Sequence, residues 1–337
     1  MALYAFDGTW KEGKTGEDPQ FENTNVFRFF EAYHKRSGSN DCYMPGIGTR
    51  FDVLGKIAGG AFGLGELRRL HDAYDQLCKN WVNGDTVIDV VGFSRGAATT
   101  LDFCHLVQEK GIRRPGGDDV VEATPQIRFL GVWDIVAAFG FRKPRQRGAE
   151  HRPPPAVAEG EPELCCFHAM ALDERRPSFL NTRLPGACEV WFRGVHSDVG
   201  GGNGNRALND VALNWMMRKA KSAGLPIDDA DIPHGEPTKL EPSHSHKLPV
   251  EVRLISAVDR CHYTVAPLEG WATPPDTCPK ETEADEQKAG ELSEAGLIVQ
   301  SEDMRRRVLA MWETAMAVAA ANEFTLDPIR EALSHAF

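Results

Sequence analysis

The sequence lacks any long uninterrupted apolar run. No stretch of its 337 residues approaches the roughly 18 to 20 consecutive apolar residues that a membrane-spanning helix needs. The first ten residues, MALYAFDGTW, contain neither a basic segment nor an extended apolar segment followed by a cleavage site, so they predict no signal peptide. We therefore expect synthesis in the cytoplasm, no integral membrane segment and at most transient membrane contact. Export would then need a signal-independent secretion system.

A surplus of positive charge is missing as well. The chain has 38 Lys and Arg residues against 49 Asp and Glu residues, which gives a formal charge of −11. Nucleic-acid-binding proteins need a basic face for the phosphates, so we expect no nucleic-acid partner. The eight cysteines include no C-x-x-C pair of the kind that binds zinc or carries redox chemistry. We expect reduced, mostly buried thiols, no metal and no cofactor.

Strand-like and helix-like segments alternate along the first two thirds of the chain. The patterns predict strands at residues 3–6, 41–48, 86–93, 127–136 and 188–195, and helices at 24–36, 66–82, 95–110 and 210–224. Strands separated by helices favour an α/β fold with a mostly parallel central sheet and helices on both of its faces.

The rest of the chain predicts insertions on one domain. With 42% hydrophobic residues and no internal repeat or boundary, we expect a single domain over residues 1–337. A Pro-, Arg- and Glu-rich segment at 141–163 and a helix-like stretch at 165–176 predict a lid or insertion over about 141–180. A strong helical pattern at 303–324 indicates a helical C-terminal region over about 285–337.

The stretch VIDVVGFSRGAAT, residues 87–99, places Ser94 between a predicted strand and a predicted helix. This G-x-S-x-G pattern in a strand–turn–helix context is typical of a nucleophile elbow, a tight turn that presents the serine hydroxyl. The flanking residues must be small to let strand and helix approach, and Gly92, Gly96 and Ala97 meet that need. A glycine-rich turn without chemistry is the alternative, which the strand–helix context disfavours.

A serine becomes a nucleophile only when a histidine takes its proton and an acid fixes the tautomer of that histidine. The chain order expected with this turn is serine, acid, histidine. Asp134 and His196 each follow a predicted strand, in that order after Ser94. Because carboxyl ends of parallel strands meet at one edge of a sheet, we predict a Ser94–Asp134–His196 triad.

Two alternatives for the triad stay open. Asp198 lies two residues after His196 and offers a second acid, or a residue that orients the loop. His168 is a competing base, although it falls within the helix-like stretch rather than at a strand end.

An oxyanion hole needs two backbone N–H groups near the serine. We expect one from Arg95 and the other from Gly8 or Thr9, which follow the first strand. Asp7 is a supporting residue that could hold this turn through side-chain hydrogen bonds.

Several ordered motifs resemble one known family. They are DGTW (7–10), TNV (24–26), PGIGT (45–49), GFSRGA (92–97), FLGVWDIV (129–136), HAMALDERR (168–176) and VWFRGVHSDVGGG (190–202). Together they resemble the DUF2235 family of uncharacterised α/β-hydrolases, which includes the catalytic domain of Tle1-type phospholipase effectors of type VI secretion. The resemblance implies an α/β-hydrolase fold and a triad of Ser94, Asp134 and His196. A secretion apparatus or an immunity protein as partner is suggested by the resemblance alone and not by any residue pattern.

These observations predict a serine hydrolase that cleaves carboxylic esters through an acyl-enzyme, and the resemblance implies phospholipid or other lipid acyl esters as substrates. The alternative is a non-catalytic α/β-hydrolase scaffold that serves as a binding or interaction protein. Two further classes fit poorly. FDGT (6–9) is similar to part of a haloacid dehalogenase signature, but the nucleophilic aspartate of that class is replaced by Ala5. GGAFGLGE (59–66) lacks the Lys-Ser/Thr ending of a phosphate-binding loop.

Overall fold

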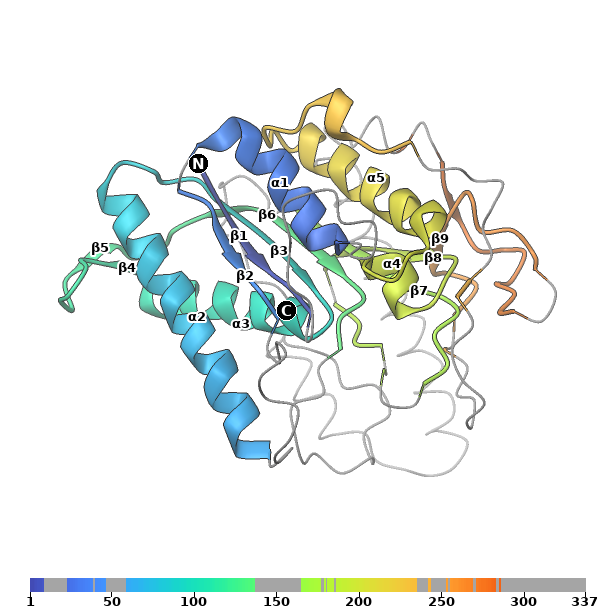
Figure 1. Cartoon of the computed structure of the whole chain (residues 1–337), viewed down its shortest axis with the longest axis horizontal. Helices are drawn as coiled ribbons and strands as arrows, with labels where there is room; N and C mark the ends of the chain where they lie inside the picture. The colour runs from blue at the N-terminus through green and yellow to red at the C-terminus, as the bar shows by residue number, and fades with distance from the viewer. Residues whose placement is uncertain are drawn as a thin grey trace, which may run out of the picture. The chain divides into compact units, whose positions relative to one another are not determined.

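The computed structural model describes residues 1–8, 23–38, 40–46, 59–136, 165–176, 179, 181–184, 186–234, 242–243, 253, 255–268, 271–282 and 285, without the side chains of 59–66. These residues belong to one compact unit, Met1–Gly290. They form an eight-stranded sheet in the order β10-β9-β8-β7-β6-β3-β1-β2, in which all neighbours pair in parallel (Figure 1). Its strands are β1 (Ala2–Phe6), β2 (Cys42–Met44), β3 (Ile88–Phe93), β6 (Ile127–Trp133), β7 (Cys165–Ala171), β8 (Cys188–Phe192), β9 (Arg260–His262) and β10 (Lys280–Glu281).

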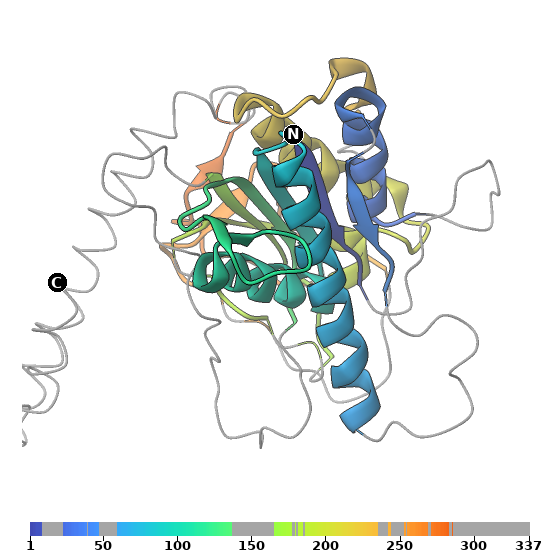
Figure 2. The same cartoon turned by 90° about the vertical axis from the view of Figure 1, so that its left-hand side faces the viewer.

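Helices cover both faces of the sheet. Helices α1 (Asn25–Ser37) and α5 (Arg206–Ser222) contribute to the apolar core on one face. Helices α2 (Gly59–Val82) and α3 (Arg95–Lys110) contribute to the core on the other face, and Figure 2 shows the sheet between the two layers. The described residues also contain a small antiparallel pair, β4 (Ile112–Arg113) with β5 (Val120–Glu122), the short helix α4 (His196–Gly200) and the 3-10 turn η2 (Asp229–Asp231).

Helix α1 illustrates how local sequence sets these elements. The Thr24 hydroxyl accepts a hydrogen bond from the Phe27 N–H at 3.2 Å and so caps the helix. Val26, Phe29 and Tyr33 recur at helical spacing and are fully buried against the sheet. The helix ends at Gly38, whose φ of 103° lies in a region that glycine tolerates best.

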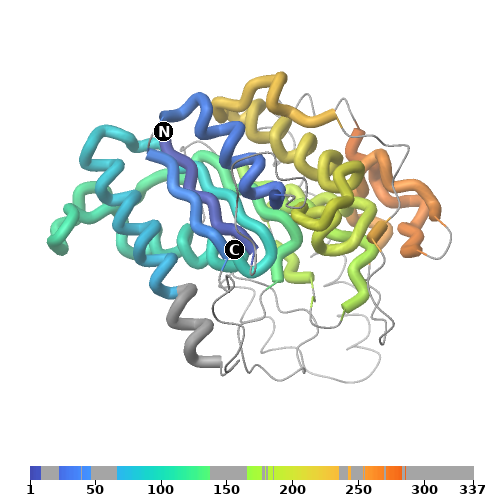
Figure 3. Tube along the Cα trace, viewed as in Figure 1, coloured from blue at the N-terminus to red at the C-terminus, as the bar shows by residue number. Residues whose placement is uncertain are grey.

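The strand order changes direction at β1, next to the predicted nucleophile turn. From β1 the chain goes to β2 on one side of it and then returns to β3 on the other side. The trace in Figure 3 shows β1 and β3 side by side, and their register pairs Phe6 with Gly92. Such a change of direction in a parallel sheet opens a binding crevice at the strand ends. The segments that follow β1 and β3 therefore meet where Gly8 and Ser94 lie.

The main predictions about the fold are confirmed. The α/β class, the parallel sheet and helices on both faces are observed, and the helix predicted at 95–110 is Arg95–Lys110. GGAFGLGE (59–66) forms the beginning of α2 and not a phosphate-binding loop. None of the helices in the described segments is long and apolar enough to cross a membrane.

One local prediction is wrong. Residues 165–171 form β7, a central strand between β6 and β8, and belong neither to a helix nor to a lid. Strands buried on both faces show continuous apolar runs without alternation, so the pattern of CCFHAMA does not separate strand from helix. Residues 141–164, 177, 178 and 180 of the predicted lid, and the C-terminal region 285–337 except Asp285, lie outside the described residues.

Candidate active site

Ser94 occupies a strained turn between β3 and α3. Its φ of 58° and ψ of −125° are unusual for a residue with a side chain. Such a conformation costs on the order of 1–3 kcal/mol and persists only where neighbouring contacts enforce it. Here the Ser94 N–H donates to the Trp133 carbonyl at 3.0 Å, and the Ser94 carbonyl accepts the Val136 N–H at 3.3 Å. The end of β6 thus holds the turn at the end of β3.

The glycines around Ser94 allow a close approach that no other residue permits. A Cβ atom on Gly92 would lie 2.2 Å from the Thr100 hydroxyl oxygen, and one on Gly96 would lie 2.3 Å from the Phe6 carbonyl oxygen. Both distances are far below van der Waals contact. The small residues therefore let α3 start directly against the ends of β1 and β3, as the sequence predicts.

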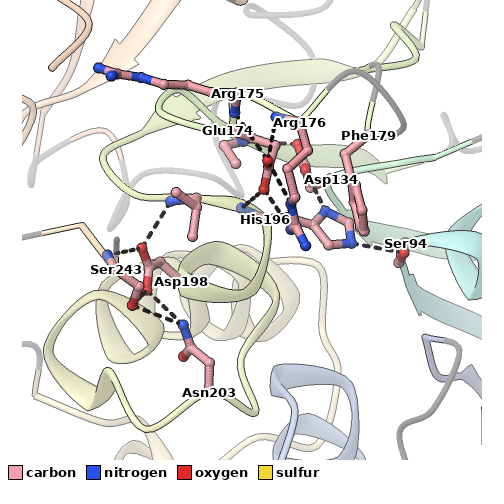
Figure 4. A network of polar contacts seen from close by, with 12 residues as sticks. Ser94, Asp134, Glu174, Arg175, Arg176, Phe179, His196, Asp198, Asn203 and Ser243 are labelled. Carbon is pink, nitrogen blue, oxygen red and sulfur yellow. Dashed lines mark hydrogen bonds and ion pairs between the residues drawn. The ribbon is translucent and has the colours of Figure 1, made fainter. Parts of the chain in front are cut away.

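The three residues of the predicted triad form one hydrogen-bonded chain (Figure 4). His196 Nε2 lies 2.8 Å from Ser94 Oγ, and His196 Nδ1 lies 2.6 Å from Asp134 Oδ2. Asp134 follows β6 and His196 begins α4 after β8, so both come from strand ends at the same edge as Ser94. All three residues are buried, with at most 5% of the surface exposed. An ionised Asp134 accepts the Nδ1 proton and leaves Nε2 free to accept the serine proton.

Arg253 sits behind Asp134. Its guanidinium donates to Asp134 Oδ1 at 2.6 Å and to Oδ2 at 3.0 Å, and Oδ1 also accepts the Ala171 N–H at 2.9 Å. Burial by itself would raise the pKa of Asp134, but Arg253 and His196 together hold that pKa well below its usual value. Asp134 is therefore a stable carboxylate at neutral pH. Like Ser94 it has a positive φ, of 39°.

His196 is neutral in the resting site. Burial lowers its pKa below the usual value and Arg253 lowers it further, which outweighs the opposing effect of Asp134. The ring packs against Phe93, with centroids 4.6 Å apart, and against the edge of Phe179, with centroids 4.8 Å apart. The backbone N–H of His196 donates to Glu174 Oε2 at 3.1 Å. These contacts fix the ring between Ser94 and Asp134 and leave it unprotonated at neutral pH.

Of the residues expected to form the oxyanion hole, the structure describes Arg95 and Gly8. Arg95 is the first residue of α3 and directly follows Ser94, so its backbone N–H lies at the positive end of the helix. Gly8 lies against the serine, since a Cβ added to it would be 3.3 Å from Ser94 Cβ. Its N–H donates to Asp7 Oδ1 at 2.6 Å, while the Thr24 and Tyr43 hydroxyls donate to Asp7 Oδ2. Asp7 thus holds the Gly8 turn, and Thr9 lies outside the described residues.

The two alternative triad residues make other contacts. Asp198 accepts hydrogen bonds from the Val195 N–H and from Asn203, Asn205 and Ser243, which orders the loop after His196 (Figure 4). His168 lies on β7 rather than on a helix, with Nδ1 2.9 Å from Glu189. Its Nε2 accepts the Ile135 N–H at 3.3 Å, directly after Asp134. Both side chains support the turns that carry the triad.

The sequence patterns assign no part in this site to three of its residues. Arg253 falls in a stretch, VEVRLISAV, that predicts only a late strand, and the isolated arginine carries no signal of its own. Glu174 and Arg176 belong to the DERR motif, whose charges suggest a local ion pair, and they do form one at 2.7 Å. Arg176 in turn lies over the Phe179 ring, 3.6 Å from its centroid. This motif therefore forms a wall of the site beside His196.

The sequence matches a known protein family. A family model described as "T6SS, Phospholipase effector Tle1-like, catalytic domain" matches residues 3–124 and 113–219. No curated protein matches. Among solved structures, the Tle1 effector bound to the VgrG spike from the Type 6 secretion system is similar, with 22% sequence identity and a TM-score of 0.41. The alignment covers 60% of this chain and 50% of that one, so the chain spans about half the length of the solved effector.

Proposed function

The chain belongs to the family of Tle1-like phospholipase effector catalytic domains of type VI secretion, and we propose that it hydrolyses acyl esters of glycerophospholipids through Ser94, His196 and Asp134. One observation carries the proposal: the unbroken chain from Ser94 Oγ to His196 at 2.8 Å and from His196 to Asp134 at 2.6 Å. Hydrogen bonds in this order are those that a serine hydrolase needs before substrate binds.

The proposed reaction has two halves. Ser94 Oγ attacks the ester carbonyl carbon while its proton passes to His196 Nε2, and Asp134 stabilises the imidazolium that forms. The backbone N–H of Arg95 and that of Gly8 or Thr9 hold the developing oxyanion. Gly8 would have to exchange its present hydrogen bond to Asp7 for one to the oxyanion. His196 then protonates the leaving alcohol. In the second half, water loses a proton to the same histidine and attacks the acyl carbonyl carbon. The fatty acid is released as Ser94 Oγ takes the proton back.

A lipid panel tests the reaction and its bond specificity. Wild type, Ser94→Ala and a matched control, Ser222→Ala, are compared on p-nitrophenyl esters of rising chain length and on intact phospholipids, with products identified by mass spectrometry. Ser222 lies at the end of α5, where its hydroxyl donates to the Arg218 carbonyl. We expect free fatty acid and lysophospholipid from wild type and Ser222→Ala, and a loss of several orders of magnitude in Ser94→Ala. Release of the head group instead would overturn the ester assignment.

We further propose that the domain acts as a cargo of type VI secretion, which family membership supports. A secreting strain with a tagged copy of the gene provides the test, because release into the medium should stop when the secretion sheath is removed. Equal release from the sheath mutant would contradict this proposal. The substrate assignment would be unaffected by that result.

A further inference from the structure

Asp134 is shared between two partners, the Arg253 guanidinium and the neutral His196 ring. Arg253 approaches Asp134 through both Oδ atoms, at 2.6 and 3.0 Å, while His196 Nδ1 approaches Oδ2 at 2.6 Å. Asp134 is fully buried, and the Arg253 side chain is 7% exposed. Arg253 lies outside residues 3–219, the region that the family model matches. The ion pair is thus an observation on this structure and does not follow from the family match.

Two hydrogen bonds to backbone carbonyls hold the Arg253 guanidinium independently of the Asp134 carboxylate. Arg253 donates to the Ala171 carbonyl at 2.6 Å and to the Phe179 carbonyl at 2.8 Å. Ala171 ends β7, and the Phe179 ring packs edge-on against His196. One side chain therefore ties together the acid, the end of a central strand and a wall of the imidazole site.

The charge of Arg253 acts on the pair in two ways. A buried carboxylate next to a neutral imidazole takes up a proton readily, and an adjacent guanidinium opposes that uptake. The same charge disfavours an imidazolium at His196, so the base stays neutral to lower pH. Among the residues that the structure describes, the other charged groups at the pair are Glu174, which accepts the backbone N–H of His196, and Arg176, which neutralises Glu174. The proton therefore enters the Asp134–His196 pair at a lower pH with Arg253 present than without it.

We propose that Arg253 is a positioning residue of the triad, which holds Asp134 ionised and aimed at His196 and extends the acidic end of the pH range in which His196 acts as the base. This inference rests on the proposed function, since it concerns the same three residues. It predicts a change in a pH profile as well as a loss of rate. A merely structural arginine would produce only the second effect.

The test is the pH dependence of kcat/KM on a short-chain ester between about pH 4.5 and 9, a profile that reports the free enzyme. The acid limb of this profile is the range in which kcat/KM falls as the pH is lowered. Arg253→Gln and Arg253→Met remove the charge, and we expect each to move the midpoint of the acid limb upward by about 1 pH unit or more. At pH 6 this shift should appear as at least a tenfold loss of kcat/KM. Arg253→Lys keeps a charge but not the bidentate geometry, so its rate should fall while its limb moves by less than half as much.

Arg193→Gln is the matched control. Arg193 is buried, donates to the carboxylate of Asp173 at 2.7 Å and also donates to two backbone carbonyls, those of Ala266 and Ala272. Like Arg253, it joins a buried carboxylate to two backbone carbonyls, but this carboxylate does not contact His196. Its substitution should lower stability and leave the acid limb in place.

The outcomes separate this inference from the function on which it rests. If wild type lacks hydrolysis, or Ser94→Ala retains it, the proposed function fails. If wild type is active and Ser94→Ala is not, yet the folded Arg253 variants keep the wild-type limb, only the role of Arg253 is overturned. The wild-type profile is a second measurement that needs no variant, because a limb centred at or above about 6.5, the ordinary histidine value, also contradicts the inference.

Discussion

Ser94 and Asp134 are the non-glycine residues with positive φ among those that the structure describes, at 58° and 39°. Strained backbone tends to survive where the surrounding structure enforces it and a function benefits. Each residue follows a central strand, and each strained turn is held by hydrogen bonds from a neighbouring strand end. The strain thus falls on the two positions where a side chain must point across the edge of the sheet toward His196.

Replacement of the acid tests the tautomer argument. In Asp134→Asn the side-chain amide would donate to Nδ1, so the proton of His196 would move to Nε2 and face Ser94 instead of accepting its proton. We expect kcat to fall by about 10³- to 10⁴-fold with the fold retained. Steady-state hydrolysis together with circular dichroism measures both effects.

Asp198→Asn is the control for that prediction, because Asp198 is as deeply buried but bonds to the loop after His196. We expect a lower stability and less than about a tenfold change in kcat, consistent with a role in loop order. A large loss in Asp198→Asn beside an active Asp134→Asn would reassign the acid to Asp198.

The sequence predicts residues that act through a local pattern and misses those that act through a distant contact. Ser94, Asp134 and His196 each follow a strand signal, so topology alone brings them together at one edge. Arg253 reaches Asp134 from 119 positions away along the chain and has no motif around it. The tie between Thr24 and Asp7 is likewise visible only in three dimensions, although both belong to motifs that the sequence presents.

At the scale of elements, the order of strands and helices could be predicted but the identity of β7 could not. Periodicity identifies an element from the contrast between its exposed and buried faces. Strand β7 has little such contrast because β6 and β8 flank it and helices cover the sheet. The short strands β9 and β10 give too few residues for any pattern.

The β10 edge is attached to α5 by buried charge. Glu281 is fully buried, pairs with Lys219 at 2.6 Å and with Arg260 at 2.8 Å, and accepts the Trp215 indole N–H. Burial by itself would raise the pKa of Glu281, but Lys219 and Arg260 hold it below its usual value. Removal of one partner of such a pair leaves the other charge buried and uncompensated.

We therefore expect Glu281→Gln to lower the free energy of unfolding by about 3 kcal/mol at pH 7. Because the folded pKa of Glu281 is depressed, its contribution is present above the unfolded value of about 4.3 and is lost as pH falls through the lower folded value. Urea denaturation at pH 7 and at pH 3.5 should show the difference from wild type shrinking at the lower pH. A difference that is independent of pH would mean that shape, and not charge, accounts for the effect.

Asp229→Asn provides the comparison for that experiment. Asp229 pairs with Lys221 at the same end of α5, but both side chains are exposed. An exposed pair of this kind contributes less than about 1 kcal/mol. A larger loss here than in Glu281→Gln would contradict the assignment of the stability to buried charge.

At the scale of the whole molecule, the net charge sets the long-range electrostatics of any approach to a lipid surface. With a formal charge of −11, the chain should be repelled by anionic vesicles at low ionic strength. We expect faster hydrolysis of zwitterionic than of anionic vesicles at about 0.01 M salt and a smaller difference at about 0.5 M, where the Debye length falls to a few ångströms. A soluble short-chain ester, which carries no surface charge, should show no comparable dependence. A preference for anionic vesicles at low salt would instead point to a local basic surface that outweighs the net charge.

We propose that Ser94 is a nucleophile whose proton His196 accepts. A fluorophosphonate probe followed by peptide mapping tests it most directly, since the probe forms a stable adduct only with an activated hydroxyl. We predict one adduct, on Ser94, which is absent from Ser94→Ala and formed at least a hundredfold more slowly in His196→Gln. An unlabelled wild type, or labelling that persists undiminished in Ser94→Ala, would contradict the account and favour a scaffold that binds without catalysis.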